Sequence, residues 1–129
     1  MKKFLAIVLM AVMALGLVAC GKSKDDGLIK VGIINNDPNE SGYRTANDKS
    51  MKEHFTEANG YSASFSYSLK NYEQIAAAQK FIQDGVDYLL LSAADTAGWD
   101  STLKEAQEAG VQVILFDRTI EADESLYVA

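Results

Sequence analysis

The chain has 129 residues, a net charge of −6, one cysteine (Cys20) and one histidine (His54). This length allows one small domain, and the acidic balance disfavours nucleic acid as a partner because its phosphates would be repelled. A single cysteine and a single histidine exclude an internal disulfide and a metal cluster of cysteines and histidines. The domain therefore has to fold through its apolar core alone.

The first 19 residues have the pattern of an export signal. Lys2 and Lys3 supply a positive start, residues 4–17 are almost entirely apolar, and small residues precede Cys20. The apolar segment is shorter than the roughly 20 residues that a membrane-spanning helix needs. The pattern predicts a signal peptide that is removed after export.

The four residues Leu17-Val18-Ala19-Cys20 resemble the bacterial lipobox, in which the thiol is lipidated and the peptide is cut before the cysteine. Cys20 is therefore predicted to anchor the mature protein to the membrane on its extracytoplasmic face. The alternative is an ordinary secretory cleavage that leaves a free thiol. Residues 20–27 are polar and predict a flexible tether, so the folded lobe is expected at residues 28–129. Without Lys2 and Lys3, 10 basic and 18 acidic side chains leave a charge of −8.

From residue 28 onwards, short apolar runs alternate with segments of helical periodicity. The apolar runs predict four strands, at residues 31–34, 63–67, 86–92 and 111–116. Helices are predicted at residues 44–58, from a cap at Asn71 to a stop at Gly85, and at residues 98–109. Their inward-facing side chains are expected to be Met51, Phe55 and Ala58, then Ile75, Ala78 and Ile82, then Leu103 and Ala106.

This alternation predicts an α/β fold, a doubly wound parallel sheet with helices on both faces and the strand order 2-1-3-4. The run Leu89-Leu90-Leu91 lacks a period of two, as expected for a strand that is covered on both faces. In such sheets ligands bind outside the carboxyl ends of the strands, where the winding reverses. The loops after the first, third and fourth strands are therefore the candidate site.

Those loops bring charged and aromatic side chains to one rim. They contain residues 35–44, then Asp95, Thr96 and Trp99, then Asp117 and Arg118. Carboxylates and guanidinium groups hold hydroxyls by charge-assisted hydrogen bonds, and an aromatic ring covers the apolar face of a sugar. The mixture predicts a carbohydrate ligand. Taken singly, each side chain also has a structural interpretation: a strand or helix cap for the charged residues, and packing under a loop for Tyr43 and Trp99.

An enzyme is less well supported by the sequence. No Gly-x-Gly-x-x-Gly motif follows the first strand and no Walker sequence is present. His54 lies in a charged helical stretch and is expected to be solvated. We therefore predict no catalytic residues, no metal site and no cofactor, although carboxylate chemistry stays open.

Two segments, Gly85-Val86-Asp87 and Phe116-Asp117-Arg118, are typical of the sugar-binding proteins of bacterial ABC importers, of the ribose-binding type with the two-lobed periplasmic-binding-protein-like I fold. The resemblance covers residues 30–129. Within that family, Glu40-Ser41-Gly42-Tyr43-Arg44, Thr96-Ala97-Gly98-Trp99 and Asp117-Arg118-Thr119-Ile120 are most similar to the galactofuranose-binding members.

The resemblance implies a set of ligand-binding residues. These are Glu40, Ser41, Gly42, Tyr43 and Arg44 on the furanose, with Arg44 as the main donor, Asp117 and Arg118 on the ring hydroxyls, and Trp99 as a wall. Tyr43 stands where galactofuranose binders carry a tryptophan, which implies a smaller stacking surface. Ribose binders carry aromatic residues where Arg44 lies, and this difference argues against ribopyranose.

The function that the resemblance implies is a lipoprotein that delivers a monosaccharide, such as galactofuranose, to an ABC permease in the membrane, without turnover. A periplasmic sensor that feeds a chemoreceptor or histidine kinase and an enzyme with a flavodoxin-like fold are the alternatives. A repressor of the same fold would need a DNA-binding helix pair where the signal peptide stands. The family has two lobes and this chain ends near the crossing between them. We therefore expect only the N-terminal lobe, a truncated sequence, and weak sugar binding by this lobe alone.

Overall fold

The computed structural model describes residues 26–129, so the predicted signal peptide and Cys20 lie outside the described residues. The elements are β1 (Ile29–Asn35), α2 (Gly42–His54), β2 (Tyr61–Tyr67), α3 (Asn71–Gln83), β3 (Tyr88–Leu91), α4 (Asp100–Glu108) and β4 (Gln112–Leu115). The four strands form one sheet in the order β2-β1-β3-β4, and every pair is parallel. The predicted fold class and strand order are confirmed.

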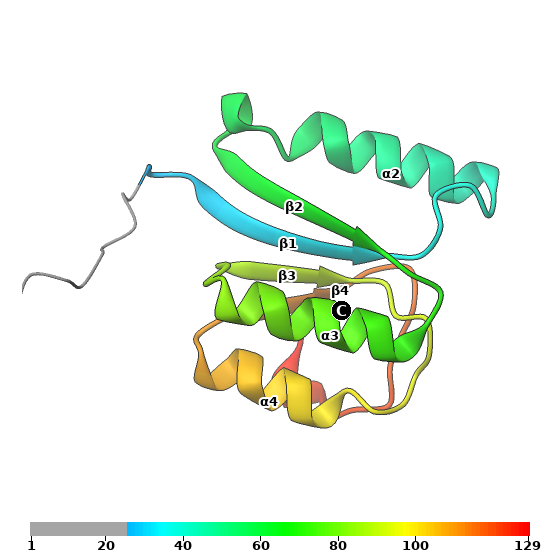
Figure 1. Ribbon diagram of the computed structural model, residues 1–129, viewed down its shortest axis with the longest axis vertical. Helices are drawn as coiled ribbons and strands as arrows, with labels where there is room; N and C mark the ends of the chain where they lie inside the picture. The colour runs from blue at the N-terminus through cyan, green and yellow to red at the C-terminus, as the bar shows by residue number, and fades with distance from the viewer. Residues whose placement is uncertain (1–25) are drawn as a thin grey trace, which may run out of the picture.

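Helices cover both faces of the sheet. Helix α2 lies on one face, over β1 and β2, and α3 and α4 lie on the other (Figure 1). The two faces follow from strand geometry, because successive side chains point to opposite sides. Leu89 and Leu91 of β3 therefore face α3 and α4, whereas Leu90 faces the side of α2.

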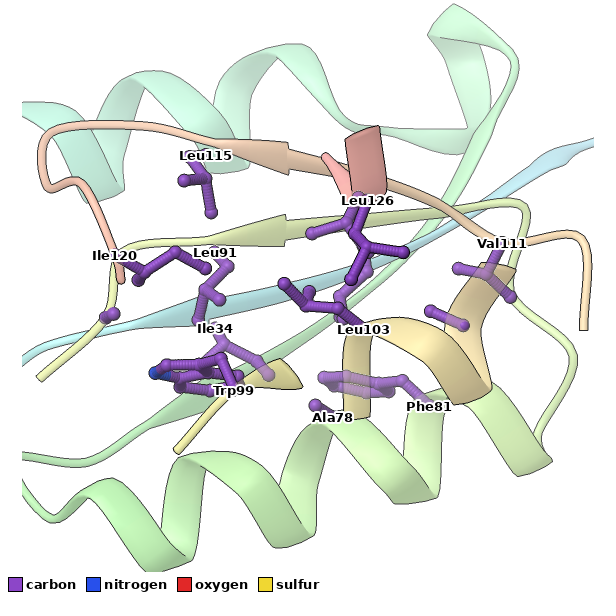
Figure 2. Close-up of a cluster of buried hydrophobic side chains, with 14 residues drawn as sticks. Ile34, Ala78, Phe81, Leu91, Trp99, Leu103, Val111, Leu115, Ile120 and Leu126 are labelled. Carbon is purple, nitrogen blue, oxygen red and sulfur yellow. The ribbon is translucent and has the colours of Figure 1, made fainter. Parts of the chain in front are cut away.

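The main core lies between the sheet and the pair α3 and α4 (Figure 2). Its strand residues are Ile34, Leu89, Leu91, Val113 and Leu115, and its helical residues include Ala78, Phe81, Leu103 and Ala106. The contact between α3 and β1 is especially close. A Cβ atom on Gly32 would lie 2.6 Å from Cγ of Phe81, so only glycine lets the Phe81 ring rest on the backbone of β1.

Helix α2 differs from its prediction. It ends at His54, where Asn59 Nδ2 donates to the His54 carbonyl at 2.9 Å, and a short 3₁₀ helix, Glu57–Asn59, follows. Met51 is half-buried as part of the expected stripe, but Ala58 is exposed. The buried positions of α2 are instead polar. They are Asp48, one turn before Met51, and Arg44, two turns before it, on the same side of the helix.

Helix α3 begins at Asn71 with Lys70 as its N-cap, so the predicted capping role of Asn71 is wrong. The Asn71 side chain instead donates to the Ala97 carbonyl at 3.0 Å and ties α3 to the loop after β3. Ala78 is buried as predicted, and Phe81, which the sequence analysis did not select, joins the core.

The end of the chain adds contacts that were not predicted. A 3₁₀ helix, Glu124–Leu126, buries Leu126 in the main core, and Ile114 pairs with Val128 in an isolated parallel bridge. Among residues 26–129, no helix is both long and apolar enough to cross a bilayer.

Candidate functional site

The charged centre of the predicted rim is the side chain of Arg44. Its Nε lies 2.6 Å from Oε2 of Glu40, and one terminal nitrogen lies 3.0 Å from Oδ2 of Asp117. The Arg44 side chain is only 8% exposed, against 44% for Glu40 and 22% for Asp117. A guanidinium removed from water in this way needs charged acceptors, and the two carboxylates supply them from the N-terminal side of α2 and the end of β4.

The start of α2 places Glu40 and Arg44 beside each other. Ser41 is the N-cap, and its Oγ accepts from the Arg44 amide at 3.2 Å. The preceding turn is closed by Asp37, whose carbonyl accepts from the Glu40 amide at 3.1 Å. Thr45 Oγ1 donates to the Pro38 carbonyl at 2.7 Å, which fixes the same loop from inside the helix. The ion pair of Glu40 and Arg44 is thus built on a capped helix end.

Asp117 follows β4 in an unusual backbone conformation. Its φ is 64°, the one positive φ of a non-glycine residue among the described residues. An aspartate tolerates this conformation better than most side chains, but it still costs on the order of 1 kcal/mol. The neighbouring Arg118 amide donates to the Phe116 carbonyl at 2.7 Å, which closes the turn around Asp117. The turn directs the Asp117 carboxylate back toward Arg44.

A hollow of about 410 Å³ lies next to these charges, between the loops after β3 and β4. It is lined by residues 93–96 and 117–119, and one terminal nitrogen of Arg118 lies 3.5 Å from the Ala94 carbonyl. A larger hollow, of about 610 Å³, lies at the opposite edge of the sheet, where Asp87 is the one charged lining residue. The smaller hollow is the better candidate, because it lies at the carboxyl ends of the strands and adjoins several charged groups.

Buried polar side chains support the rim from behind. The residues concerned are Asn36, Gln74 and Ser92, each at most 1% exposed. Gln74 holds two loops at once: its Nε2 donates to the carbonyls of Ser68 and Ser92 at 3.0 and 3.2 Å, and its Oε1 accepts from the Ala94 amide at 2.7 Å. Both N–H groups of its amide and one of the two lone pairs of its oxygen are thus used to fix the ends of β2 and β3.

Helix α2 is held on the sheet by a polar cluster of Asp48, Lys52 and Tyr67. The Asp48 carboxylate accepts from the Tyr67 hydroxyl and from Lys52 Nζ, the latter at 2.8 Å. Burial alone would raise the pKa of Asp48, but these two hydrogen bonds outweigh it and hold the pKa below its usual value. Burial and the hydrogen bond to Asp48 raise the pKa of Tyr67.

A second polar contact fixes the same helix. Asn35 Nδ2 donates to Oδ1 of Asn47 at 3.1 Å and joins the end of β1 to α2. The position of Arg44 therefore depends on polar contacts along α2 as well as on its own ion pairs.

The structure brings together Glu40, Arg44, Asp117 and Arg118, four of the eight predicted residues. Ser41 and Gly42 belong to the helix start and contribute its cap and first turn. Tyr43 is 56% exposed at the same helix end.

Trp99 does not lie at the rim. Its side chain is 0% exposed and packs in the main core, as Figure 2 shows, and its Nε1 donates to the Asp95 carbonyl at 3.1 Å. A fully enclosed indole cannot cover a sugar here, so the predicted wall is wrong. The large apolar ring gains more by packing in the main core, beside Ile34 (Figure 2), than by facing solvent.

The sequence analysis missed Asn36, Gln74 and Ser92 as parts of the site. A signal existed for two of them, because Ser92 is the first polar residue after the apolar run of β3, and Asn36 is the second after that of β1, directly behind Asn35. Gln74 has no comparable signal, and only the packing of α3 shows that its amide points under the loops.

The arrangement presents hydrogen-bonding groups without an evident reactive group. His54 is exposed, and its Nδ1 lies 2.8 Å from the Ser50 carbonyl, away from the rim. Within residues 26–129, no three His, Cys, Asp or Glu side chains are grouped so that they could hold a metal ion. Paired carboxylates and guanidinium groups beside an open hollow can bind a neutral polyhydroxylated molecule.

The chain is similar to proteins that are named for the sugars they bind. The chain is 36% identical over 131 residues to the fructose import binding protein of Bifidobacterium longum, covering 96% of this chain and 39% of that protein. It is 35% identical over 91 residues to the galactofuranose-binding protein of Escherichia coli, covering 69% of this chain and 28% of that protein. Its fold matches a Mycobacterium smegmatis protein in complex with β-D-fucofuranose at a TM-score of 0.70 and 38% identity, covering 77% of this chain and 33% of the other.

The chain therefore spans between about a quarter and two fifths of the length of these relatives. The match of the family model begins within β1, at residue 31, and includes the whole of β2, β3 and β4. Since the family model of the periplasmic binding protein domain matches residues 31–129, and the parallel sheet has the predicted order, the chain belongs to the periplasmic binding protein domain family.

Proposed function

We propose that this chain is the sugar-binding lobe of an extracytoplasmic solute-binding protein that serves an ABC importer. The observation that carries the proposal is the buried Arg44 guanidinium between the carboxylates of Glu40 and Asp117, at the carboxyl edge of the sheet. Charged groups that are already paired bind a neutral ligand without burying an uncompensated charge. A sugar fits this chemistry, since its hydroxyls both donate and accept.

We further propose that the sugar is a furanose. Two similar proteins support this choice, one named for galactofuranose and one solved with β-D-fucofuranose. The fructose import binding protein is a third relative and keeps the exact sugar open among furanoses and related ketoses. Arg44 donates to the ring hydroxyls, Asp117 and Glu40 accept from them, and Arg118 closes the hollow beside Ala94. The exposed ring of Tyr43 is the available stacking surface.

The proposed location and partner follow from the family and from the N-terminal sequence. Cys20 is the proposed lipidation site, so the mature protein is anchored on the extracytoplasmic face of the membrane, close to its permease. Residues 20–27 give the lobe a tether. The permease is the proposed membrane partner, and the protein itself performs no turnover.

A sugar panel tests the binding function. Galactofuranose, fructofuranose, fucofuranose, ribose and glucose are titrated into the full-length gene product by isothermal calorimetry, for wild type and Arg44→Ala. We expect the preferred furanose to bind Arg44→Ala roughly 10- to 100-fold more weakly, since hydrogen bonds to a charged donor are worth about 1.5–3 kcal/mol.

Lys49→Ala is the matched control, because Lys49 is a cation on the same helix, is exposed, and pairs among residues 26–129 only with Glu53, at 3.8 Å. Its affinity should equal that of wild type. Equal furanose affinity in wild type and Arg44→Ala would show that the proposed site is wrong, and binding of none of the sugars by wild type would contradict the function.

The anchor is tested separately. Cells that express wild type or Cys20→Ser are labelled with a clickable palmitate analogue and fractionated. Wild type should carry the label and sediment with the membrane, whereas Cys20→Ser should lose both properties. An unlabelled wild-type protein in the soluble extracytoplasmic fraction would favour ordinary secretory cleavage and would contradict the lipid anchor.

A further inference from the structure

Two buried polar side chains connect the ends of three strands beneath the charged cluster. Asn36 directly follows β1, Ser92 directly follows β3, and Asp117 lies just beyond β4. Asn36 Nδ2 donates to both the carbonyl oxygen and Oγ of Ser92, each at 3.1 Å. Ser92 Oγ in turn donates to Oδ2 of Asp117 at 3.3 Å. Beyond the carboxyl ends of the strands, where the backbone hydrogen bonds of the sheet have ended, these side chains therefore connect β1, β3 and β4.

The direction of this chain of hydrogen bonds is fixed by its chemistry. The Ser92 carbonyl can only accept, so the Asn36 amide has to present its NH₂ group to it. This orientation leaves Oδ1 of Asn36 buried and without a hydrogen-bond partner in the structure. A carbonyl oxygen that is buried without a partner loses its hydrogen bonds to water and is therefore destabilising. The cost indicates that donation toward Ser92 outweighs satisfaction of the whole amide.

Donation by Asn36 has a consequence for the serine hydroxyl. Because Ser92 Oγ already accepts from Asn36, its own proton is free to point at Asp117. Oδ2 of Asp117 then has two partners: the Ser92 hydroxyl, which donates to it at 3.3 Å, and the Arg44 guanidinium, with which it forms an ion pair at 3.0 Å. Both fix the same oxygen. Oδ1 of Asp117 receives no hydrogen bond from residues 26–129, and it belongs to a side chain that lines the 410 Å³ hollow.

We propose that Asn36 and Ser92 are positioning residues for sugar recognition, which orient Asp117 so that its Oδ1 accepts a sugar hydroxyl. The inference rests on the proposed function, because it names the support of that same site. Asp117 needs such support more than most carboxylates, since its backbone is held at a φ of 64°. A carboxylate that is oriented before the ligand arrives loses less conformational entropy on binding.

The test is a double-mutant cycle on sugar affinity in the full-length protein. Ser92→Ala removes the hydroxyl but leaves the Ser92 carbonyl, and it is measured alone and combined with Asp117→Ala. We expect Ser92→Ala alone to weaken binding of the preferred sugar about tenfold. In the Asp117→Ala background the same change should alter affinity less than twofold, because the oriented carboxylate is absent.

Ser62→Ala is the matched control, a half-buried serine in β2 at the other end of the sheet. It should leave affinity unchanged in both backgrounds. A loss on Ser92→Ala that is equally large without Asp117 would overturn the proposal, because the serine would then act through general stability. Unfolding midpoints of all variants, measured in parallel, identify that case.

A crystal structure of unliganded Ser92→Ala provides a second readout that needs no sugar. The expected result is a turned Asp117 side chain whose Oδ2 no longer contacts Arg44 as in wild type. An unchanged Asp117 rotamer would overturn the positioning role. If wild type binds no sugar, the proposed function fails, and this readout still decides whether the Ser92 hydroxyl orients the carboxylate. The same structure of Asn36→Ala decides the role of Asn36, whose loss should also turn the Asp117 side chain.

Discussion

The two faces of the sheet are built in different ways. Beneath α3 and α4 lies one continuous apolar cluster that includes Trp99, Leu103 and Leu91. On the side of α2, apolar burial is limited to a few strand residues such as Val31 and Ile33, and the helix presents Arg44 and Asp48. The face that gives stability and the face that carries the charged site are therefore separate.

Part of the sheet face on the side of α2 is open, and this distinguishes it from the closed core on the other face. An apolar hollow of about 240 Å³ lies on that face, and it is lined by Ile29, Val31, Phe55, Tyr61, Tyr88, Leu90 and Ile114. Helix α2 covers β1 and β2 but leaves β3 and β4 largely uncovered (Figure 1). Contacts with α2 are thus mainly hydrogen bonds and ion pairs, which fix geometry more than they add free energy.

The largest predicted effect compares two neighbours in β3 that face opposite sides. Leu91→Ala should lower the free energy of unfolding by about 2–5 kcal/mol, because Leu91 is fully enclosed in the main core. Leu90→Ala should cost less than half as much, since Leu90 is half-buried beside the open hollow. Urea unfolding of the full-length protein followed by circular dichroism measures both.

The pair is its own control, because the two substitutions delete the same atoms from the same strand. Equal losses would show that the α2 side is as well packed as the other side. The contrast between the faces would then have to be abandoned.

A second prediction adds an atom to the main core. Gly32→Ala should destabilise the protein by about 1–3 kcal/mol, because the new Cβ would lie 2.6 Å from the Phe81 ring. In a Phe81→Ala background Gly32→Ala should cost less, so that part of the loss is recovered, since alanine lacks the Cγ and Cδ2 atoms that the new Cβ would meet. Ala63, the neighbour of Val31 on β2, faces the other side, and Ala63→Gly provides a control for backbone propensity. The absence of any recovery would mean that strand propensity rather than packing penalises the change.

The fold could be predicted from the sequence because its signals are local. The apolar run at Leu89-Leu90-Leu91 and the glycine stops give the elements, and right-handed crossovers then leave few strand orders. Boundaries were less accurate, as at α2, where the helix ends at His54 and the side chain of Asn59 caps it. This cap is a contact between residues five positions apart, and the spacing of apolar residues in the sequence does not reveal it.

The charged part of the site could also be predicted, because Glu40, Arg44 and Asp117 all follow the strands whose ends meet at one edge. Trp99 was placed wrongly, since its role depends on how α4 packs on the sheet and not on its position in the chain. Gln74 was missed for the same reason, since its role depends on how α3 packs. Nothing local distinguishes the buried amide of Gln74 from an exposed one.

The smallest predicted effect concerns the polar attachment of α2. Asp48→Asn keeps the size and an acceptor oxygen but removes the charge that faces Lys52 and Tyr67. The pKa of Asp48 is lowered in the folded protein, so the ionised carboxylate contributes stability above its unfolded pKa of about 4, and this contribution is lost as the pH falls through the lower folded value. Asp48→Asn should therefore cost about 1 kcal/mol at pH 7 and much less near pH 3.

Asp84→Asn is the control for Asp48→Asn, because it removes an acidic side chain that does not attach α2 to the sheet. Asp84 pairs with Lys80 at 2.6 Å on the surface of α3, and both side chains are more than half exposed. An exposed pair of this kind contributes about 0–0.5 kcal/mol, so Asp84→Asn should change unfolding little at either pH. If Asp48→Asn behaves like Asp84→Asn, or if its cost is as large at pH 3 as at pH 7, the charge of Asp48 does not hold α2 on the sheet. The apolar contacts of Phe55 with Tyr61, whose ring centres lie 5.1 Å apart, would then have to hold it.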